Sequence, residues 1–256
     1  MHHYKVRISY KGTNYFGWQS QEAITVETDR PTVQTTIHHV LRKISKYQDC
    51  NVSGASRTDR GVHAQSQLGK LTIPFDIEAE KLKMGMNALL PKDIRIVECE
   101  ACEKKFNPSR MSKHKEYHYY FCISEIENPA LSDIVAHVPG PLDILSMKKA
   151  VKLFEGEHDF LNFYSPSSQA ATTVRTVKTC EIIKADFSSF YGDVYFIKIT
   201  GAGFLKHMVR CIAGAVFGVG KGTVSLEEVS EHLKLQQQEE KLGRKAKARG
   251  LHLIRN

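Results

Sequence analysis

The sequence predicts an α+β fold, because segments with the two-residue period of a strand alternate with segments that carry a helical apolar stripe. The first strand is predicted over 4–10, where apolar and polar residues alternate. Thr32 is a candidate cap for a helix whose apolar side chains recur three and four positions apart. Three strands and two helices within about 100 residues indicate one α+β unit, and enough chain follows for a second.

The second part of the chain also contains strand-like and helix-like segments. Aromatic and polar residues alternate over 113–124, which predicts a strand, and a helix is predicted over 143–154. The Phe106–Arg110 segment is the expected linker, so we predict an N-terminal half over 1–105 and a C-terminal half over 106–256. The other predicted elements are strand 68–73, helix 77–90, a strand from 94, strands 173–183 and 194–200, a helix that ends near 219 and a last strand close to the C-terminus.

Composition limits the class of protein. The 256 residues allow one large or two modest cores, and 41% hydrophobic residues is ordinary for a globular protein. The net charge of +8 fits a polyanionic partner such as nucleic acid. The six scattered cysteines and the lack of an apolar signal region indicate an intracellular protein, which we expect in the cytoplasm, with an organelle or the nucleus left open. No run reaches the roughly 18 apolar residues of a membrane span.

The stretch Gly54–Gln67 concentrates small and polar residues, two arginines and one carboxylate, which is typical of a functional loop. Arg57 and Asp59 are two residues apart, so an extended backbone sends both side chains to the same side. A neighbouring arginine favours the ionised carboxylate. Such a carboxylate can be a nucleophile, a base or a metal ligand, and the alternative is a loop ion pair without chemistry.

This stretch resembles the catalytic loop of the TruA family of tRNA pseudouridine synthases. In that family Arg-Thr-Asp is followed by a small or basic residue and then by Gly-Val-His-Ala, and the chain has Arg57–Asp59, Arg60 and Gly61–Ala64 at these places. Ser56 stands where bacterial members usually have glycine, and Arg60 where they usually have alanine. A basic residue at position 60 resembles the eukaryotic branch, so these departures concern the choice of tRNA and not the type of reaction.

Further segments from Tyr4 to Leu253 are similar to the same family, in the same order. Lys11–Gln19 looks like its opening loop, whose aromatic residues either stack on RNA or cap the core. Lys115–Tyr119 looks like the motif with the base-stacking tyrosine, and Phe204–Arg210 like the motif with the arginine that pairs with the catalytic aspartate. Ala248–Leu253 is similar to the terminal segment. Arg210 in an apolar helix is costly unless its charge is paired, which independently favours a carboxylate partner.

The resemblance implies the roles of the site residues. Asp59 is the expected nucleophile, at C1′ of the ribose or at C6 of the uracil ring, and both remain open. Arg210 is expected to hold Asp59 ionised, Tyr117 to stack on the free base, and Arg57 to fill the vacated base stack and bind phosphate. Arg57 and Tyr117 are thus expected both in catalysis and in substrate binding. The other residues expected to bind substrate are Arg60, His63, Lys11 and Phe204. No cofactor and no metal are expected.

The resemblance also implies the wider architecture and the partner. Two similar α/β halves with antiparallel sheets are expected to meet at a central basic cleft, the N-terminal half carrying the aspartate loop. The expected partner is tRNA, the expected targets are the uridines at positions 38–40 on the 3′ side of the anticodon arm, and the expected assembly is a homodimer. Eukaryotic relatives modify other tRNA sites and other RNAs, which stays an alternative.

Two other classes of function stay open on the residues alone. A metal-dependent RNA hydrolase could be built on Asp59 and His63, and it predicts loss of activity with a chelator. A non-catalytic RNA-binding protein of the same fold predicts that Asp59→Ala leaves its RNA function intact.

Overall fold

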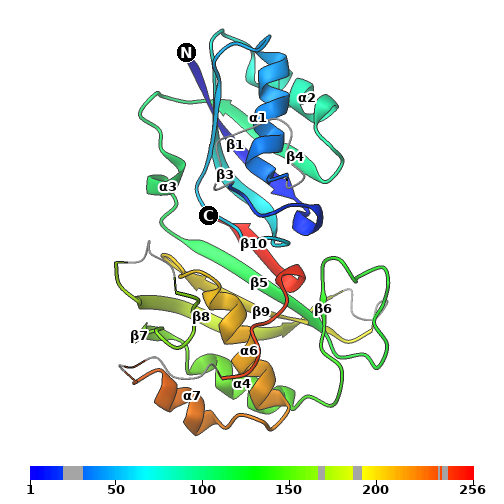
Figure 1. Ribbon diagram of the computed structural model, residues 1–256, viewed down its shortest axis with the longest axis vertical. Coiled ribbons are helices and arrows are strands. Elements are labelled where there is room, and N and C mark those ends of the chain that lie inside the picture. Colours follow the sequence, from blue (N-terminus) through cyan, green and yellow to red (C-terminus); the bar gives the residue numbers. More distant parts are fainter. Residues whose placement is uncertain (20–30, 167–170, 187–191, 236, 238–241) are drawn as a thin grey trace. The chain divides into compact units, whose positions relative to one another are not determined.

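The computed structural model describes residues 1–19, 31–166, 171–186, 192–235, 237 and 242–256 (Figure 1). These residues divide into two compact units. Unit 1 is Met1–Lys113 together with Leu253–Asn256, and unit 2 is His114–His252. The sequence predicts a division at residue 105. In the structure the chain up to Lys113 stays with unit 1, where the Ser109 hydroxyl donates a hydrogen bond to the Gly54 carbonyl at 3.4 Å.

Unit 1 contains an antiparallel sheet of strands β1 (His2–Tyr10), β2 (Asn51–Gly54), β3 (His63–Ile73) and β4 (Ile94–Ala101). Strand β1 lies between β3 and β4, and β2 pairs with β3. The C-terminal residue is tied to this sheet, because the Asn256 side chain accepts a hydrogen bond from the Leu68 N–H at 2.8 Å and donates one to the Ser56 hydroxyl at 2.8 Å.

Helices α1 (Val33–Ile44) and α2 (Ala79–Leu89) lie side by side against one face of the unit 1 sheet (Figure 1). The predicted cap is confirmed, since the Thr32 hydroxyl accepts a hydrogen bond from the Thr35 N–H. The predicted apolar stripe of α1 is confirmed too, because its buried residues are Val33, Ile37, Val40 and Leu41. Two short helices, η1 (Gly12–Asn14) and α3 (Pro108–Met111), complete this unit.

Unit 2 contains a second antiparallel arrangement, in the order β5 (Lys115–Cys122), β9 (Val194–Gly201), β8 (Val174–Lys184) and β7 (Gly156–Asp159). The short strand β6 (Ala136–His137) runs parallel to β5. Helices α4 (Ile144–Lys152), α6 (Met208–Gly220) and α7 (Leu226–His232) belong to the same unit. Near the C-terminus, η2 (Ala248–Gly250) leads into β10 (Leu251–Arg255).

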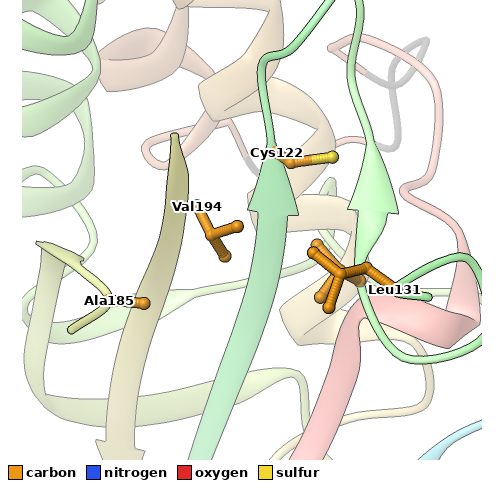
Figure 2. Close-up of a cluster of buried hydrophobic side chains, with 5 residues drawn as sticks. Cys122, Leu131, Ala185 and Val194 are labelled. Atoms are coloured by element: carbon orange, nitrogen blue, oxygen red, sulfur yellow. The ribbon is translucent and has the colours of Figure 1, made fainter. Parts of the chain in front are cut away.

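The two faces of β5 have different surroundings. Tyr119 and Phe121 pack edge-on against Phe217 of α6, so the odd-numbered side chains of β5 face this helix. Cys122 points the other way, into a small second core with Leu131, Val135, Ala185 and Val194 (Figure 2). The connection between β5 and β6 supplies part of this core, and it covers one end of the face that lies away from α6.

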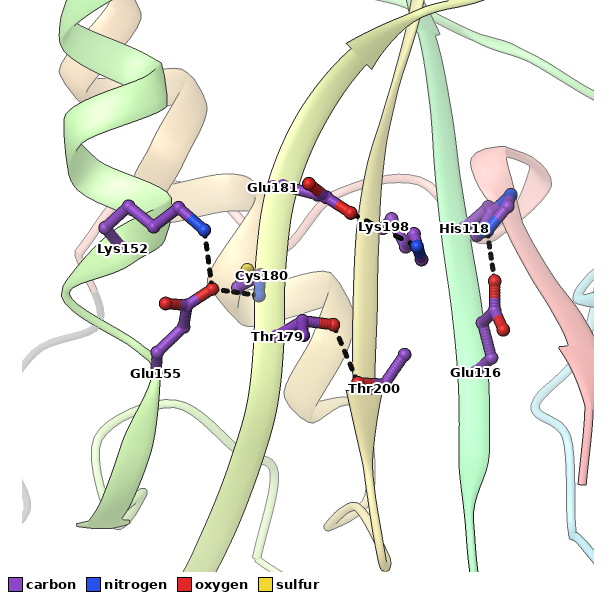
Figure 3. Close-up of polar contacts among 9 residues, drawn as sticks. All are labelled: Glu116, His118, Lys152, Glu155, Thr179, Cys180, Glu181, Lys198 and Thr200. Atoms are coloured by element: carbon purple, nitrogen blue, oxygen red, sulfur yellow. Dashed lines mark hydrogen bonds and ion pairs between the residues drawn. The ribbon is translucent and has the colours of Figure 1, made fainter.

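Polar pairs lie on strands β5, β8 and β9 of unit 2 and at the end of α4 (Figure 3). The Glu116 carboxylate lies 2.9 Å from His118, and burial lowers the pKa of His118 although this carboxylate opposes the effect. The other pairs in this view are Thr179 with Thr200, Lys198 with Glu181, and Lys152 with Glu155, whose carboxylate also accepts the Cys180 N–H. Glu116 and His118 therefore lie on the face opposite to Tyr117 and Tyr119.

The α+β class and the type of each predicted element are confirmed, and one boundary differs by more than two residues. Strand β3 begins at His63, five positions before the predicted Leu68, because pairing with β1 extends to Ala64 opposite Tyr10. The second half of the Gly54–Gln67 stretch is therefore strand and not loop. Within the described chain, no helix has the length and apolar character needed to cross a membrane.

Candidate active site

The segment that carries Asp59 connects β2 to β3 in unit 1, and Thr58 anchors it. The Tyr10 hydroxyl lies 2.7 Å from the Thr58 hydroxyl, in a buried hydrogen bond between residues 48 positions apart. The Trp18 N–H donates to the Thr58 carbonyl at 3.0 Å. Thr58 is buried, Asp59 is half-buried and Arg57 is exposed, so the buried threonine holds the backbone between two residues of the expected site.

The opening loop of the chain packs backbone against backbone on this segment. A Cβ atom on Gly12 would lie 2.0 Å from the Val62 carbonyl oxygen, and one on Gly17 would lie 2.6 Å from the Thr58 carbonyl oxygen. Gly17 also has a φ of +97°, which side-chain-bearing residues rarely adopt. The two motifs that resemble the same family are thus in direct contact, and only glycine permits this distance.

Aromatic residues of the opening loop support the segment from the core. Trp18 is 2% exposed, and its ring lies against Gly54 at the end of β2. Tyr15 is buried, its hydroxyl donates to Asp93 at 2.6 Å, and its carbonyl accepts the Gly61 N–H at 3.3 Å. The sequence left two alternatives for these aromatic residues, stacking on RNA or capping the core. Trp18 and Tyr15 cap the core.

The backbone turns directly after Asp59. The Val62 N–H donates to the Asp59 carbonyl at 3.1 Å, and Gly61 within this turn has a φ of +77°. Together with the contacts at Thr58, this turn restrains the backbone on both sides of Asp59. A carboxylate on a restrained backbone is pre-organised for reaction with a bound substrate.

His63, for which the sequence predicts a role in substrate binding, is a buried residue. It is 2% exposed, and its Nδ1 accepts a hydrogen bond from the Gly12 N–H at 3.1 Å. This bond requires an unprotonated Nδ1, so the proton of the neutral ring lies on Nε2. The same bond occupies a nitrogen that a metal site with Asp59 would use, so the geometry gives the hydrolase alternative no support. His63 joins the opening loop to the start of β3.

The three predicted basic residues of unit 1 have different settings. Arg57 is exposed. The Arg60 guanidinium lies over the Phe16 ring, 4.1 Å from its centre, and is also exposed. Lys11 is half-buried, and its N–H donates to the Asp93 carbonyl at 2.9 Å. Arg57 and Arg60 are accessible to a polyanion, and Arg60 is oriented by an aromatic ring.

In unit 2, Tyr117 and Phe204 form an aromatic pair. Their ring centres are 5.4 Å apart and their planes are perpendicular. Tyr117 is 8% exposed on the α6 face of β5, and Phe204 is half-buried in the connection from β9 to α6. The structure therefore brings together these two predicted residues, which the sequence separates by β6 to β9.

Arg210 lies in the first turn of α6 and is the one residue of this helix that is not buried. Its Nε donates to the Ala246 carbonyl at 2.8 Å, and the Ala246 N–H donates to the Arg210 carbonyl at 3.0 Å. The Tyr119 hydroxyl donates to the neighbouring Lys247 carbonyl at 2.8 Å. Burial raises the pKa of Tyr119, and the positive charge of Arg210 opposes that rise. Arg210 thus joins the first turn of α6 to the C-terminal segment at Ala246.

His207 lies between two predicted site residues, Phe204 and Arg210, and the sequence assigned it no role. It precedes α6 with a φ of +62°, a strained conformation for a residue with a side chain. Its Nδ1 lies 2.7 Å from the Ser165 hydroxyl and 3.3 Å from the Lys245 ammonium. Its position within the Phe204–Arg210 motif could have drawn attention to it in the sequence. Its positive φ is known only from the structure.

The predicted residues thus fall into two groups. Unit 1 holds Asp59, Arg57, Arg60, Lys11 and His63, and unit 2 holds Tyr117, Phe204 and Arg210. A profile of the tRNA pseudouridine synthase family matches residues 7–109 and 150–255, which include every one of these residues except Tyr117. The chain belongs to the tRNA pseudouridine synthase family.

Relatives of this synthase match over nearly their whole lengths. A tRNA pseudouridine synthase A 2 of Desulfotalea psychrophila is 49% identical over 259 residues, which cover 100% of this chain and 98% of the relative. A tRNA pseudouridine synthase A of Thermodesulfovibrio yellowstonii is 38% identical over 232 residues, covering 89% and 88%. One of a Thermoanaerobacter species is 35% identical over 255 residues, covering 100% and 99%. The family predicted from the motifs is confirmed.

Proposed function

We propose that this synthase isomerises uridine to pseudouridine at positions 38–40 of tRNA, on the 3′ side of the anticodon arm, with Asp59 as the nucleophile. Membership of the family supports the reaction. The observation that carries the role of Asp59 is its place on a backbone restrained by Tyr10, Trp18 and Val62. The targets rest on the resemblance of the motifs alone.

The reaction conserves all atoms and electrons of the nucleotide. Flipping the uridine out of its stack costs a few kcal/mol. In one route an Asp59 oxygen bonds to C1′, the C1′–N1 bond breaks, and its electron pair passes to the uracil ring. The ring then turns, C5 bonds to C1′, the carboxylate leaves, C5 loses a proton and N1 gains one.

In the other route the Asp59 carboxylate adds to C6. The electron pair of the C5–C6 double bond then moves through C4 to the O4 oxygen. The glycosidic bond then breaks from this adduct with its electron pair passing to N1, and C5 bonds to C1′. The carboxylate leaves C6 as C5 loses its proton and the double bond returns, and N1 gains a proton. Either route places negative charge on the ring before the new bond is complete.

Three other residues have proposed roles in this reaction. Arg210 pairs with Asp59 and keeps it ionised, Tyr117 stacks on the base while it turns, and Arg57 fills the space that the base leaves in the RNA stack. The hydrogen bond from the Arg210 Nε to the Ala246 carbonyl supports its role, since it orients the guanidinium group. The edge-on contact of Phe204 supports that of Tyr117, because it orients the ring.

The two departures from the family pattern have different consequences for the choice of RNA. Ser56 is buried, and its hydroxyl accepts the Asn256 side chain, so it serves packing within unit 1. Arg60 is exposed beside Phe16 and can reach a phosphate. Arg60 is therefore the residue that supports the alternative proposal, a eukaryotic-type choice of other uridines.

We also propose a homodimer and a cytoplasmic location, both of which rest on the resemblance and on the composition of the chain. Light scattering of the purified protein tests the first: a mass of one chain would contradict it. All six cysteines are free, which is compatible with a reducing compartment.

The function is tested by tritium release from tRNA transcripts that carry [5-³H]uridine, because the new bond at C5 displaces its hydrogen. We expect release in the presence of EDTA, and none from transcripts with cytidine at positions 38–40. Cleavage of the transcripts that stops with EDTA, without tritium release, would favour the hydrolase alternative. Binding without release from any tRNA would favour the non-catalytic RNA-binding alternative.

Tyr10→Phe tests the restraint on Asp59. The change removes only the buried hydroxyl that bonds to Thr58. We expect the free energy of unfolding to fall by about 1 kcal/mol and kcat to fall about tenfold, because the Asp59 backbone loses a support while RNA contacts stay. Tyr47→Phe is the control, because it removes a hydroxyl from an exposed ring. It should change neither the free energy of unfolding nor kcat. An unchanged kcat in Tyr10→Phe would contradict the proposed restraint.

A further inference from the structure

Lys115 is a half-buried cation at the start of β5. Among the described residues, its ammonium group makes no hydrogen bond and no ion pair. Burial lowers its pKa, which shows that the protein around it disfavours the charge. A lysine in such a position is destabilising unless a ligand uses it, since partly buried cations are normally paired.

The strand register places Lys115 beside the aromatic pair of unit 2. Lys115 and Tyr117 lie on the same face of β5, two positions apart. In the pairing of β5 with β9, Lys115 is opposite Gly201 and Tyr117 is opposite Ile199. A Cβ atom on Gly201 would lie 3.3 Å from the tip of the Phe204 ring, so this ring extends over the glycine that faces Lys115. Lys115, Phe204 and Tyr117 therefore form one cluster.

The chemistry of this cluster fits a base that acquires negative charge. Two aromatic side chains offer flat and edge contacts to a pyrimidine, and an ammonium at their border offers a donor to a carbonyl oxygen. A donor that is partly shielded from water stabilises developing charge more than an exposed one does. The exposed lysines of the chain, Lys113 among them, do not have this property.

We propose that the Lys115 ammonium contacts a carbonyl oxygen of the target uracil and stabilises the negative charge that the ring acquires during isomerisation. This inference rests on the proposed function. It holds for attack at C1′, where the broken C1′–N1 bond leaves its electron pair on the ring, and for attack at C6, where the electron pair reaches O4. Lys115 keeps its proton throughout, so the balance of the reaction does not change.

Lys115→Met is the test, with kcat, the Kd for tRNA and the melting temperature measured in parallel. Methionine keeps the unbranched stem and removes the charge. We expect kcat to fall about 100-fold, as for removal of one charge-stabilising donor, with a Kd within about twofold of wild type. The melting temperature should stay the same or rise, because a partly buried unpaired charge is removed. Lys115→Arg keeps the charge and should retain more activity than Lys115→Met.

The control is Lys113→Met, which removes the same charge from an exposed position two residues earlier. It should behave as wild type. An unchanged kcat in Lys115→Met overturns the inference, and so does a loss explained by a weaker Kd, which would indicate a phosphate contact. If wild type and Lys113→Met release no tritium, the proposed function fails. If they do and Lys115→Met equals them, only the inference fails.

Discussion

Asp59→Asn is expected to abolish tritium release, with a fall in kcat of at least about 10⁴-fold. Asparagine has nearly the same shape, but its amide is a poor nucleophile at C1′ and at C6. The Kd for tRNA should change little, because positive side chains supply most of the affinity for a polyanion. The loss should therefore appear in kcat and in single-turnover rates, measured with saturating enzyme.

Asp49→Asn is the matched control for this change. Asp49 is an exposed carboxylate of the same unit, shortly before β2, so its replacement alters the net charge equally. We expect wild-type release from this variant. Full release by Asp59→Asn would assign the nucleophile to another residue, and equal loss in both variants would mean that the net charge of unit 1 limits the reaction.

Gly12→Ala is expected to destabilise unit 1 and to disable the site together. The added methyl group would lie 2.0 Å from the Val62 oxygen and 2.7 Å from the Val62 carbonyl carbon. Both atoms belong to the backbone next to the Asp59 turn, so relief of the clash must displace this turn or the opening loop. We expect a loss of about 3 kcal/mol in the free energy of unfolding, typical of overpacking. In a chain of this size that lowers Tm by roughly 10 °C.

Activity separates a local displacement from general instability. Measured well below its melting temperature, Gly12→Ala should still bind tRNA but lose most of its kcat, because Asp59 is displaced. Gly85→Ala is the control: in α2 the nearest atom to the new methyl group is the Ile44 Cδ1 at 3.6 Å, an ordinary contact. It should gain about 0.5–1 kcal/mol, the difference in helix propensity. Equal stability of the two variants would contradict the close approach.

Local patterns were sufficient for most of the fold. Alternation over 4–10 and the apolar stripe after Thr32 are properties of neighbouring residues, and β1 and α1 lie where they predict. The start of β3 was wrong, because the small and polar residues before Leu68 look like loop. These residues form a strand because they pair with β1, which lies about 50 residues earlier in the sequence.

The sequence named candidate residues for the site, but it did not predict the contacts that hold them in place. The motif around Asp59 identified the family, which the comparisons confirm. His63 is predicted to contact substrate, and in the structure it is buried and accepts a hydrogen bond from the Gly12 N–H. Motif resemblance cannot separate a residue that touches a ligand from one that supports the loop, since both recur within the same stretch.

By itself, the sequence determined the class of fold, the order of its elements and the residues that carry the proposed chemistry, because these follow from periodicity and residue type over a few positions. Only the tertiary structure decided which residues meet. Tyr10 bonds to Thr58, Arg210 to Ala246, and Lys115 lies opposite Gly201, over which the Phe204 ring extends. Such contacts depend on the path of the chain between distant positions, and burial and hydrogen bonding act on the side chains that this path brings together.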